Sequence, residues 1–111
     1  GLDHKDPQYW SRFNSDISKW DTNRVTYMRY MFNNAKAFNS DVSKWEISSV
    51  TDMRLMFKDA RVFNSDISKW DTSRVYSMNE MFNHAKLFNS DLSKWNTFSV
   101  ITMEKIFKNS G

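Results

Sequence analysis

The chain has 111 residues and a formal net charge of +3 at pH 7, with 26% charged and 40% hydrophobic residues, which is typical of one folded domain. The absence of cysteine excludes disulfides, thiolate metal sites and cysteine nucleophiles, and no apolar run reaches the roughly 18 residues of a membrane-spanning helix. Because acidic residues recur beside the basic ones, the charge pattern argues against nucleic-acid binding.

Residues 1–12 precede a repeat and contain two aromatic residues, Tyr9 and Trp10. Trp10 does not fit the regular spacing of the tryptophans that follow it. The segment also lacks the apolar core of a signal peptide. We predict that residues 1–12 form an N-terminal capping segment for the domain behind them.

A repeat of 25 residues fills the rest of the chain. Phe-Asn-Ser-Asp begins at Phe13 and recurs every 25 residues, and a Trp, a Met and a second Phe in each unit keep the same spacing. Four units without insertions are typical of a stacked repeat protein, in which each unit packs only on its neighbours. We therefore predict one repeat domain at residues 13–111, with units at 13–37, 38–62, 63–87 and 88–111.

The two halves of each unit have different hydrophobic periods. The first half places one aliphatic residue between polar neighbours, as a short strand does; these residues are Ile17, Val42, Ile67 and Leu92. The second half spaces its apolar residues as one face of an α-helix; in the second unit these residues are Val50, Met53, Met56, Phe57 and Ala60. Residues 46–49 upstream, and residue 52 with its equivalents, are the N-cap candidates. The predicted fold class is an α/β solenoid, a leucine-rich-repeat-like stack of four 25-residue strand–turn–helix–turn coils.

When the units stack, each repeated position forms a row of side chains along the stack. The Met and aromatic rows are interpreted as core. The repeated asparagine, Asn14 and its equivalents Asn39, Asn64 and Asn89, is interpreted as a buried hydrogen-bonded row at a turn.

One set of rows forms the candidate binding face, which we call the polar face. It consists of Asp16, Asp41, Asp66, Asp91, Ser18, Ser43, Ser68, Ser93, Lys19, Lys44, Lys69 and Lys94. Like charges about 4.8 Å apart repel by roughly 1–3.5 kcal/mol, so other interactions must offset the repulsion within each row. Three explanations stay open: the aspartates pair with the lysines or accept hydrogen bonds from turn amides, the face binds a peptide or glycan, or the aspartates hold a divalent metal. One carboxylate per coil gives few ligands for calcium, which weakens the third explanation.

The sequence argues against an enzyme. His4 and His84 are far apart in the sequence, the repeated serines have no base beside them, and no glycine-rich phosphate loop is present. We therefore predict no catalytic residues, no cofactor and no metal site. A basic stripe for nucleic acid is the weaker alternative, because acidic residues interrupt it; it would use Arg24, Arg29, Arg54, Arg61 and Arg74.

The motif Phe-Asn-Ser-Asp-Ile-Ser-Lys-Trp-Asp-Thr-Ser-Arg-Val, followed by Met-x-x-Met-Phe-x-x-Ala, resembles the repeat of mycoplasma lipoproteins and related bacterial surface proteins. In pattern it is similar to the BspA-type leucine-rich repeats. The resemblance covers residues 13–110. It implies a leucine-rich-repeat-like solenoid on an extracellular or cell-surface protein that acts in adhesion and in binding host proteins or other partners.

From these observations we expect a non-enzymatic surface-protein module that binds a protein or glycan through an extended face. The alternative is a structural spacer stalk that holds another domain away from the cell, because the polar face is nearly uniform among the units. The exposed ends of a stack also invite end-to-end self-association.

Overall fold

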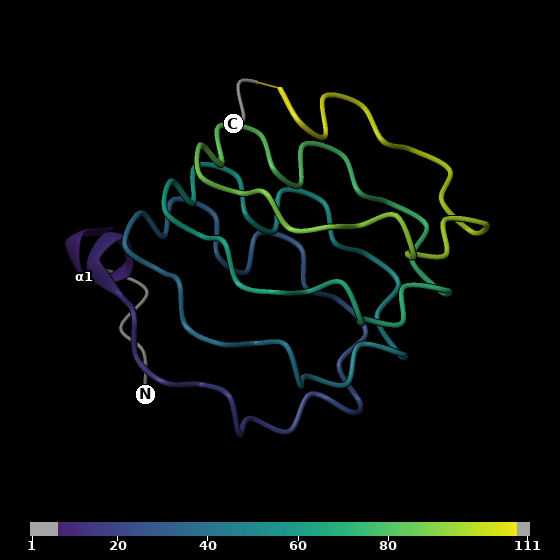
Figure 1. Cartoon of the computed structure of the whole chain (residues 1–111), viewed down its shortest axis with the longest axis horizontal. Coiled ribbons are helices and arrows are strands. Elements are labelled where there is room, and N and C mark those ends of the chain that lie inside the picture. Colours follow the sequence, from purple (N-terminus) through teal and green to yellow (C-terminus); the bar gives the residue numbers. More distant parts are fainter. Residues whose placement is uncertain (1–6, 109–111) are drawn as a thin grey trace.

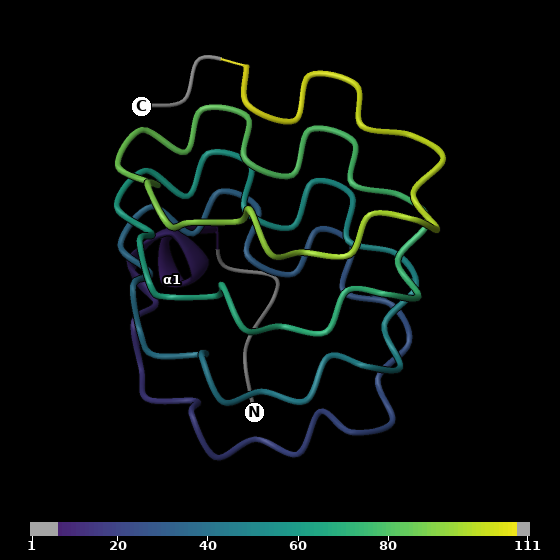
Figure 2. The same cartoon turned by 45° about the vertical axis from the view of Figure 1, so that its right-hand side comes forward.

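The computed structural model describes residues 7–108, which begin with a short helix, α1, at Pro7–Arg12. After α1 the chain winds upward, and each 25-residue unit lies on the one before it, from purple to yellow in Figure 1 and in the rotated view of Figure 2. The radius of gyration is 13.0 Å, close to the ~13 Å expected for a compact domain of about 100 residues.

Backbone hydrogen bonds join neighbouring units at equivalent positions. The amide of Met28 donates to the carbonyl of Asp52 at 2.9 Å, and the amide of Phe32 donates to that of Met56 at 2.8 Å. The same pattern continues from the second unit to the third and from the third to the fourth. The 25-residue register of the sequence is therefore the register of the stack.

The helix predicted in the second half of each unit is wrong, because α1 is the only helix in residues 7–108. Between residues 28 and 35 the amides alternate in direction. Those of Met31 and Asn33 donate to carbonyls three residues earlier, at 3.3 and 3.1 Å, whereas those of Tyr30 and Phe32 donate to the next unit. A helix would keep every one of these amides within its own segment.

Residues in the left-handed region prevent the helix from continuing. Tyr30 and Asn34 have φ values of 63° and 65°, and right-handed helices do not accommodate such residues. Five equivalent residues in the later units share this conformation: Leu55, Asp59, Glu80, His84 and Lys105.

The strand predicted in the first half of each unit is also wrong. The parallel pairing found in residues 7–108 consists of isolated bridges, Tyr27 with Asp52, Asp52 with Ser77, and Ser77 with Thr102. The α/β solenoid with leucine-rich-repeat-like strand–turn–helix–turn coils is therefore contradicted. The described chain is a compact stack of turns.

Side chains take the place of strand pairing in the first half of each unit. The amide of Asn39 donates to the side-chain Oδ1 of Asn14 at 2.8 Å. The carbonyl of Ile17 accepts the indole N–H of Trp45 at 2.9 Å. Because side chains already satisfy these backbone groups, a β-ladder here would add fewer hydrogen bonds.

The core lies inside the stack and contains the predicted apolar rows. The four repeated aliphatic residues are buried in three units and half-buried at Leu92. Two rows of phenylalanines stack along the axis, with ring centroids 5.9–6.0 Å apart in one row and 5.6–5.8 Å in the other. The rows are Phe13, Phe38, Phe63 and Phe88, and Phe32, Phe57, Phe82 and Phe107.

Trp10 of α1 stacks on the first coil, with its ring 5.1 Å from Phe13 and 6.1 Å from Phe32. Part of the predicted capping segment, residues 1–6, lies outside the described residues, as do residues 109–111 of the fourth unit. The division into a capping segment and one repeat domain stays a prediction.

The left-handed conformation at Tyr30 can be tested with two substitutions that remove the same ring. In a helix, Tyr30→Gly would be less stable than Tyr30→Ala by about 1 kcal/mol. At positive φ the order reverses, because the alanine Cβ clashes with the backbone, and we expect Tyr30→Gly to be more stable by about 1 kcal/mol. Urea unfolding of the two variants measures the difference. A glycine variant less stable than the alanine variant would contradict the described backbone.

Candidate functional site

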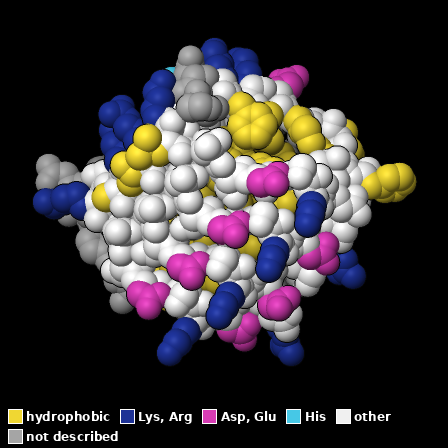
Figure 3. All heavy atoms as spheres, viewed as in Figure 1, with side chains coloured by type: hydrophobic (Ala, Val, Ile, Leu, Met, Phe, Trp, Pro, Cys, Tyr) yellow, Lys and Arg dark blue, Asp and Glu magenta, His cyan; other side chains and the backbone are white. Residues whose placement is uncertain are grey.

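The polar face lies on the surface of the stack. Its four aspartates and four lysines are exposed, and its serines are half-buried in the first three units and exposed in the fourth. Figure 3 shows a row of acidic side chains beside a row of basic ones on one face of the molecule. This arrangement agrees with the rows that the repeat spacing predicts.

Each aspartate of the polar face closes a small turn. The Oδ1 atom of Asp16 accepts a hydrogen bond from the amide of Ser18 at 2.9 Å. The other three aspartates make the same contact with the serine two residues on, at 2.9–3.0 Å. This is the Asx turn, in which the side chain satisfies a backbone donor and fixes the local chain direction.

These turns lower the pKa of the four aspartates. In the first and fourth units the amide of the serine contributes most and its hydroxyl second. In the second and third units the hydroxyl contributes most and the amide second. The neighbouring lysine adds a smaller lowering of the pKa in each unit. The carboxylates therefore stay ionised to a lower pH than ordinary aspartates.

Repulsion within the acidic row is a minor influence. It raises the pKa of Asp41 through Asp16 and that of Asp91 through Asp66, and in both it is the smallest cause. None of the four aspartates lies within 4.0 Å of a lysine nitrogen in residues 7–108. Of the two contacts that could stabilise these aspartates, ion pairs with the lysines and hydrogen bonds from turn amides, the structure of residues 7–108 contains the hydrogen bonds.

No group of three or more His, Asp or Glu side chains in the described chain is placed to hold a metal ion. The carboxylates of the polar face are instead spread along the stack, one in each unit. His4 lies outside the described residues. The Nδ1 atom of His84 lies 3.7 Å from Oδ1 of Asp59, and neither residue belongs to the polar face.

A second set of Asx turns follows the polar face in three units. Asp21 accepts from the amide of Asn23 and Asp71 from that of Ser73, both at 3.1 Å. In the fourth unit Asn96 makes the same turn, since its Oδ1 accepts the amide of Phe98 at 2.9 Å. A neutral side chain can therefore close this turn.

The asparagine row forms, but on the surface rather than in the core. Asn14, Asn39 and Asn64 each use Oδ1 to accept the backbone amide of the next unit, at 2.7–2.8 Å. These residues are exposed. The amides thus connect side chain to backbone between units, and they do not form the buried row that was predicted.

One charged cluster was not predicted as a site. Asp52 is fully buried, and its Oδ2 lies 3.2 Å from Nε of Arg54 and 3.5 Å from Nη1 of Arg29. The hydroxyl of Tyr76 lies 3.5 Å from the same oxygen. The Arg29 guanidinium also lies over the ring of Tyr27, 4.7 Å from its centroid. The sequence signal for this cluster is an acidic residue, Asp52, with one arginine two residues later and another in the preceding unit.

This cluster also bears on the basic stripe considered for nucleic acid. Two of its five arginines, Arg29 and Arg54, share the buried carboxylate of Asp52. Their charge is therefore partly neutralised within the protein. The prediction that the chain does not bind nucleic acid stays a prediction.

Replacing the four aspartates of the polar face by asparagine should reduce the acid sensitivity of the fold. Because the folded pKa values are lowered, the carboxylates add stability above the unfolded pKa of about 3.9, and this is lost as the pH falls through their folded pKa. We expect the urea midpoint of the native chain to fall more between pH 6 and pH 2 than that of the variant. Asparagine keeps the turn, as Asn96 does. Equal falls in both proteins would contradict this role of the carboxylates.

Within residues 7–108, the one helix is six residues long, and no helix there is long and apolar enough to cross a membrane. No curated protein and no solved structure matches the chain. Residues 7–111 match a family model described as "Mycoplasma protein of unknown function, DUF285". This match agrees with the mycoplasma part of the resemblance, whereas the likeness to BspA-type repeats remains one of pattern. By this match over nearly its whole length, the chain belongs to the DUF285 family of mycoplasma proteins.

Proposed function

We propose that this chain is a non-enzymatic module of an extracellular or cell-surface protein, and that it binds a protein or glycan partner through the polar face. The observation that carries the proposal is the exposure of four aspartates whose direction is fixed by turns. A carboxylate held in place before binding loses less conformational entropy when it meets a ligand. The surface location rests on the family match and on the resemblance to surface lipoproteins.

The chemistry of the polar face suits a ligand that repeats its own polar groups. Carboxylates accept hydrogen bonds from hydroxyls, and lysines donate hydrogen bonds to oxygens. Both recur once per coil, so a chain of sugar units or a polar peptide would meet the same donors and acceptors several times. Several weak contacts made by one ligand at the same time then give a higher overall affinity than any single contact.

The retained charge is a second support. The Asx turn at residue 96 shows that asparagine suffices for such a turn. The polar face nevertheless carries aspartate in all four units. The charge strengthens each turn, since hydrogen bonds from the serine lower the pKa of the aspartate, and it also leaves carboxylate lone pairs that a ligand can use.

A spacer stalk is the second candidate function. It is favoured by the uniformity of the polar face, since the same Asp, Ser and Lys recur in all four units. A binding face for an irregular partner would vary its exposed side chains from unit to unit. Uniform side chains fit a repetitive ligand or no ligand.

The test is a screen of glycan arrays and cell surfaces with the native chain and with a variant carrying Asp→Asn at all four positions of the polar face. We expect the variant to lose binding by more than about tenfold, because a hydrogen bond to a charged group is worth about 1.5–3 kcal/mol. Circular dichroism and urea midpoints at pH 7 establish that the fold is kept. Asparagine is preferred to alanine because it retains the turn acceptor.

The matched control makes the same change outside the polar face, at Asp21 and Asp71. These residues close the second set of turns, and we expect their replacement by asparagine to leave binding unchanged. Equal loss in both variants would point to a general effect of charge and not to the polar face. If neither the native chain nor the variants bind, the spacer becomes the preferred function.

A further inference from the structure

Exposed tyrosines and arginines surround the buried carboxylate of Asp52. We call four of them the tyrosine–arginine patch: Tyr27 and Arg29 of the first unit, Arg54 of the second and Tyr76 of the third. Both guanidiniums and the hydroxyl of Tyr76 meet at one atom, Oδ2 of Asp52, at 3.2–3.5 Å. The second unit has a coil on each side of it, so the patch lies on the side of the stack and not at either end.

The two arginines keep most of their hydrogen-bond donors. A guanidinium has five N–H groups, and one nitrogen of each arginine faces Asp52, namely Nη1 of Arg29 and Nε of Arg54. No other carboxylate within residues 7–108 lies within 4.0 Å of either guanidinium. The two side chains are 42% and 41% exposed. Two guanidiniums against one carboxylate therefore leave a net positive charge at the surface, with unused donors on both arginines.

Asp52 holds the two arginines in place. Its Oδ1 accepts the amide of Arg54 at 3.1 Å, and its Oδ2 faces both guanidiniums. The equivalent residues in the third and fourth units are Ser77 and Thr102, so a small neutral side chain also fits this place in the stack. A buried carboxylate needs charged partners, and arginines that it holds lose less conformational entropy when a ligand binds.

The tyrosines add apolar area beside this charge. The guanidinium of Arg29 lies over the ring of Tyr27, 4.7 Å from its centroid. Tyr27 and Tyr76 are 58% and 40% exposed. Tyrosine and arginine, together with tryptophan, are enriched among the residues that contribute most of the binding energy at protein interfaces. The composition of the patch is therefore that of a protein-binding surface.

The patch changes from unit to unit, unlike the polar face. The position of Arg29 and Arg54 is occupied by Asn79 in the third unit and by Glu104 in the fourth. A repeating glycan would meet different groups in successive coils here. Side chains that do not repeat match a partner that does not repeat, and this favours a protein over a glycan as the ligand.

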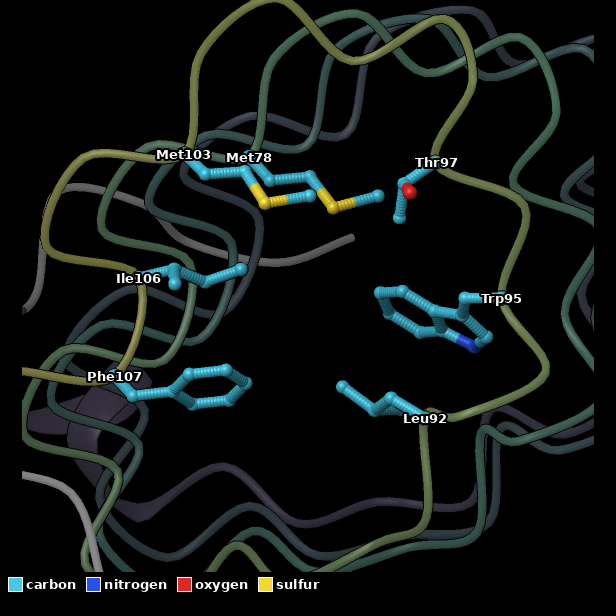
Figure 4. Close-up of a pocket in the computed structure, with 7 residues that line it drawn as sticks. All are labelled: Met78, Leu92, Trp95, Thr97, Met103, Ile106 and Phe107. Atoms are coloured by element: carbon cyan, nitrogen blue, oxygen red, sulfur yellow. The ribbon is translucent and has the colours of Figure 1, made fainter.

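The apolar hollow in the last described coil has a different character. It measures about 140 Å³, and Figure 4 shows Met78, Trp95 and Phe107 among the side chains around it. These residues belong to the Met, Trp and Phe rows of the core. Specific recognition of a ligand needs placed polar groups, which the patch has and this hollow of mostly apolar side chains lacks. The hollow is therefore a continuation of the core.

We propose that the tyrosine–arginine patch binds a partner protein through an Asp or Glu side chain of that partner, whose carboxylate meets both Arg29 and Arg54. Both guanidiniums contact the same oxygen of Asp52, so one incoming carboxylate is within reach of both. Arginine binds carboxylates through paired N–H···O hydrogen bonds, and the tyrosine rings pack on apolar side chains beside the carboxylate. This surface is separate from the polar face and does not depend on a ligand there.

The first experiment selects a displayed library of short random peptides on the native chain. We expect the selected peptides to share an Asp or Glu with apolar neighbours. Replacing that residue by its amide, Asn or Gln, should weaken binding by about tenfold or more, because hydrogen bonds to charged groups contribute that factor. Isothermal titration of the synthetic peptides measures the affinities. A selection that gives no shared acidic position overturns the proposal.

The main variant of the chain is Asp52→Ser with Arg54→Asn. It copies Ser77 and Asn79 of the third unit into the second, so it leaves no buried carboxylate unpaired and keeps the net charge of the chain. We expect it to bind the selected peptide about tenfold more weakly or worse, while circular dichroism and the urea midpoint show that the fold is kept. An unchanged affinity in this folded variant would contradict the proposal.

Glu46→Gln with Arg61→Gln is the matched control. It also removes one acidic and one basic side chain from the second unit, and both are exposed and outside the patch and the polar face. We expect the peptide affinity to stay the same. Equal losses in the control and the main variant would show a general effect of charge. Displacement of the peptide by a low concentration of a single-stranded oligonucleotide would assign the arginines to nucleic acid. Either result overturns the proposal.

The second experiment is a double-mutant cycle that assigns the contact to one side chain. Arg54→Lys keeps a positive charge beside Asp52 but removes the planar guanidinium. This variant is combined with the amide substitution in the peptide. We expect the combined loss of affinity to be smaller than the product of the two separate losses, because both changes remove the same contact. Losses that multiply independently would show that the carboxylate binds elsewhere on the chain, and the proposal would be wrong.

Discussion

Alternation of the backbone amides in the second half of each unit is the constraint on which the rest of the structure depends. Every second amide from Met28 to Asn34 bonds to the next unit, and the amides of Met31 and Asn33 bond within their own turn. Left-handed residues at Tyr30 and Asn34 make this alternation possible. A single unit would leave half of these amides without partners, which costs free energy when they are shielded from water. The units are therefore stable only as a stack.

The first half of each unit follows from this constraint. The hydrogen bonds between second halves already set the spacing of the units along the axis, so the first half need not form strands. Side chains satisfy the backbone polar groups there. Asn14 bonds the next unit, Asp16 bonds its own turn, and Trp45 reaches back to Ile17. Each of these contacts uses a repeated residue. The exposed aspartates of the polar face are thus a product of the same arrangement that holds the coils in register.

The sequence predicts the register, the core rows and the rows of the polar face, because all three depend only on repeat spacing. It did not predict the backbone. Val50, Met53, Met56, Phe57 and Ala60 are all buried, as a helix face would be, and apolar periodicity does not distinguish that face from successive turns with the same residues inward. A usable signal lies at positions 34, 59 and 84, where Asn, Asp and His are the residues other than glycine that most often adopt positive φ. Tyr30 and Leu55 carry no such signal, so only the neighbouring coil explains their conformation.

The charge of the aspartates bears on function. Repulsion along the acidic row is small, because the hydrogen bonds of the turns outweigh it and the pKa of all four carboxyls is lowered. Asparagine at the same positions would close the turns, as Asn96 does, but without the charge that these hydrogen bonds stabilise. A carboxylate with one oxygen bonded to a turn amide still has lone pairs for further donors. In a spacer the charge would serve only to strengthen the turns, whereas a binding face would also use these lone pairs. The aspartates are therefore the feature on which the binding and spacer functions differ most.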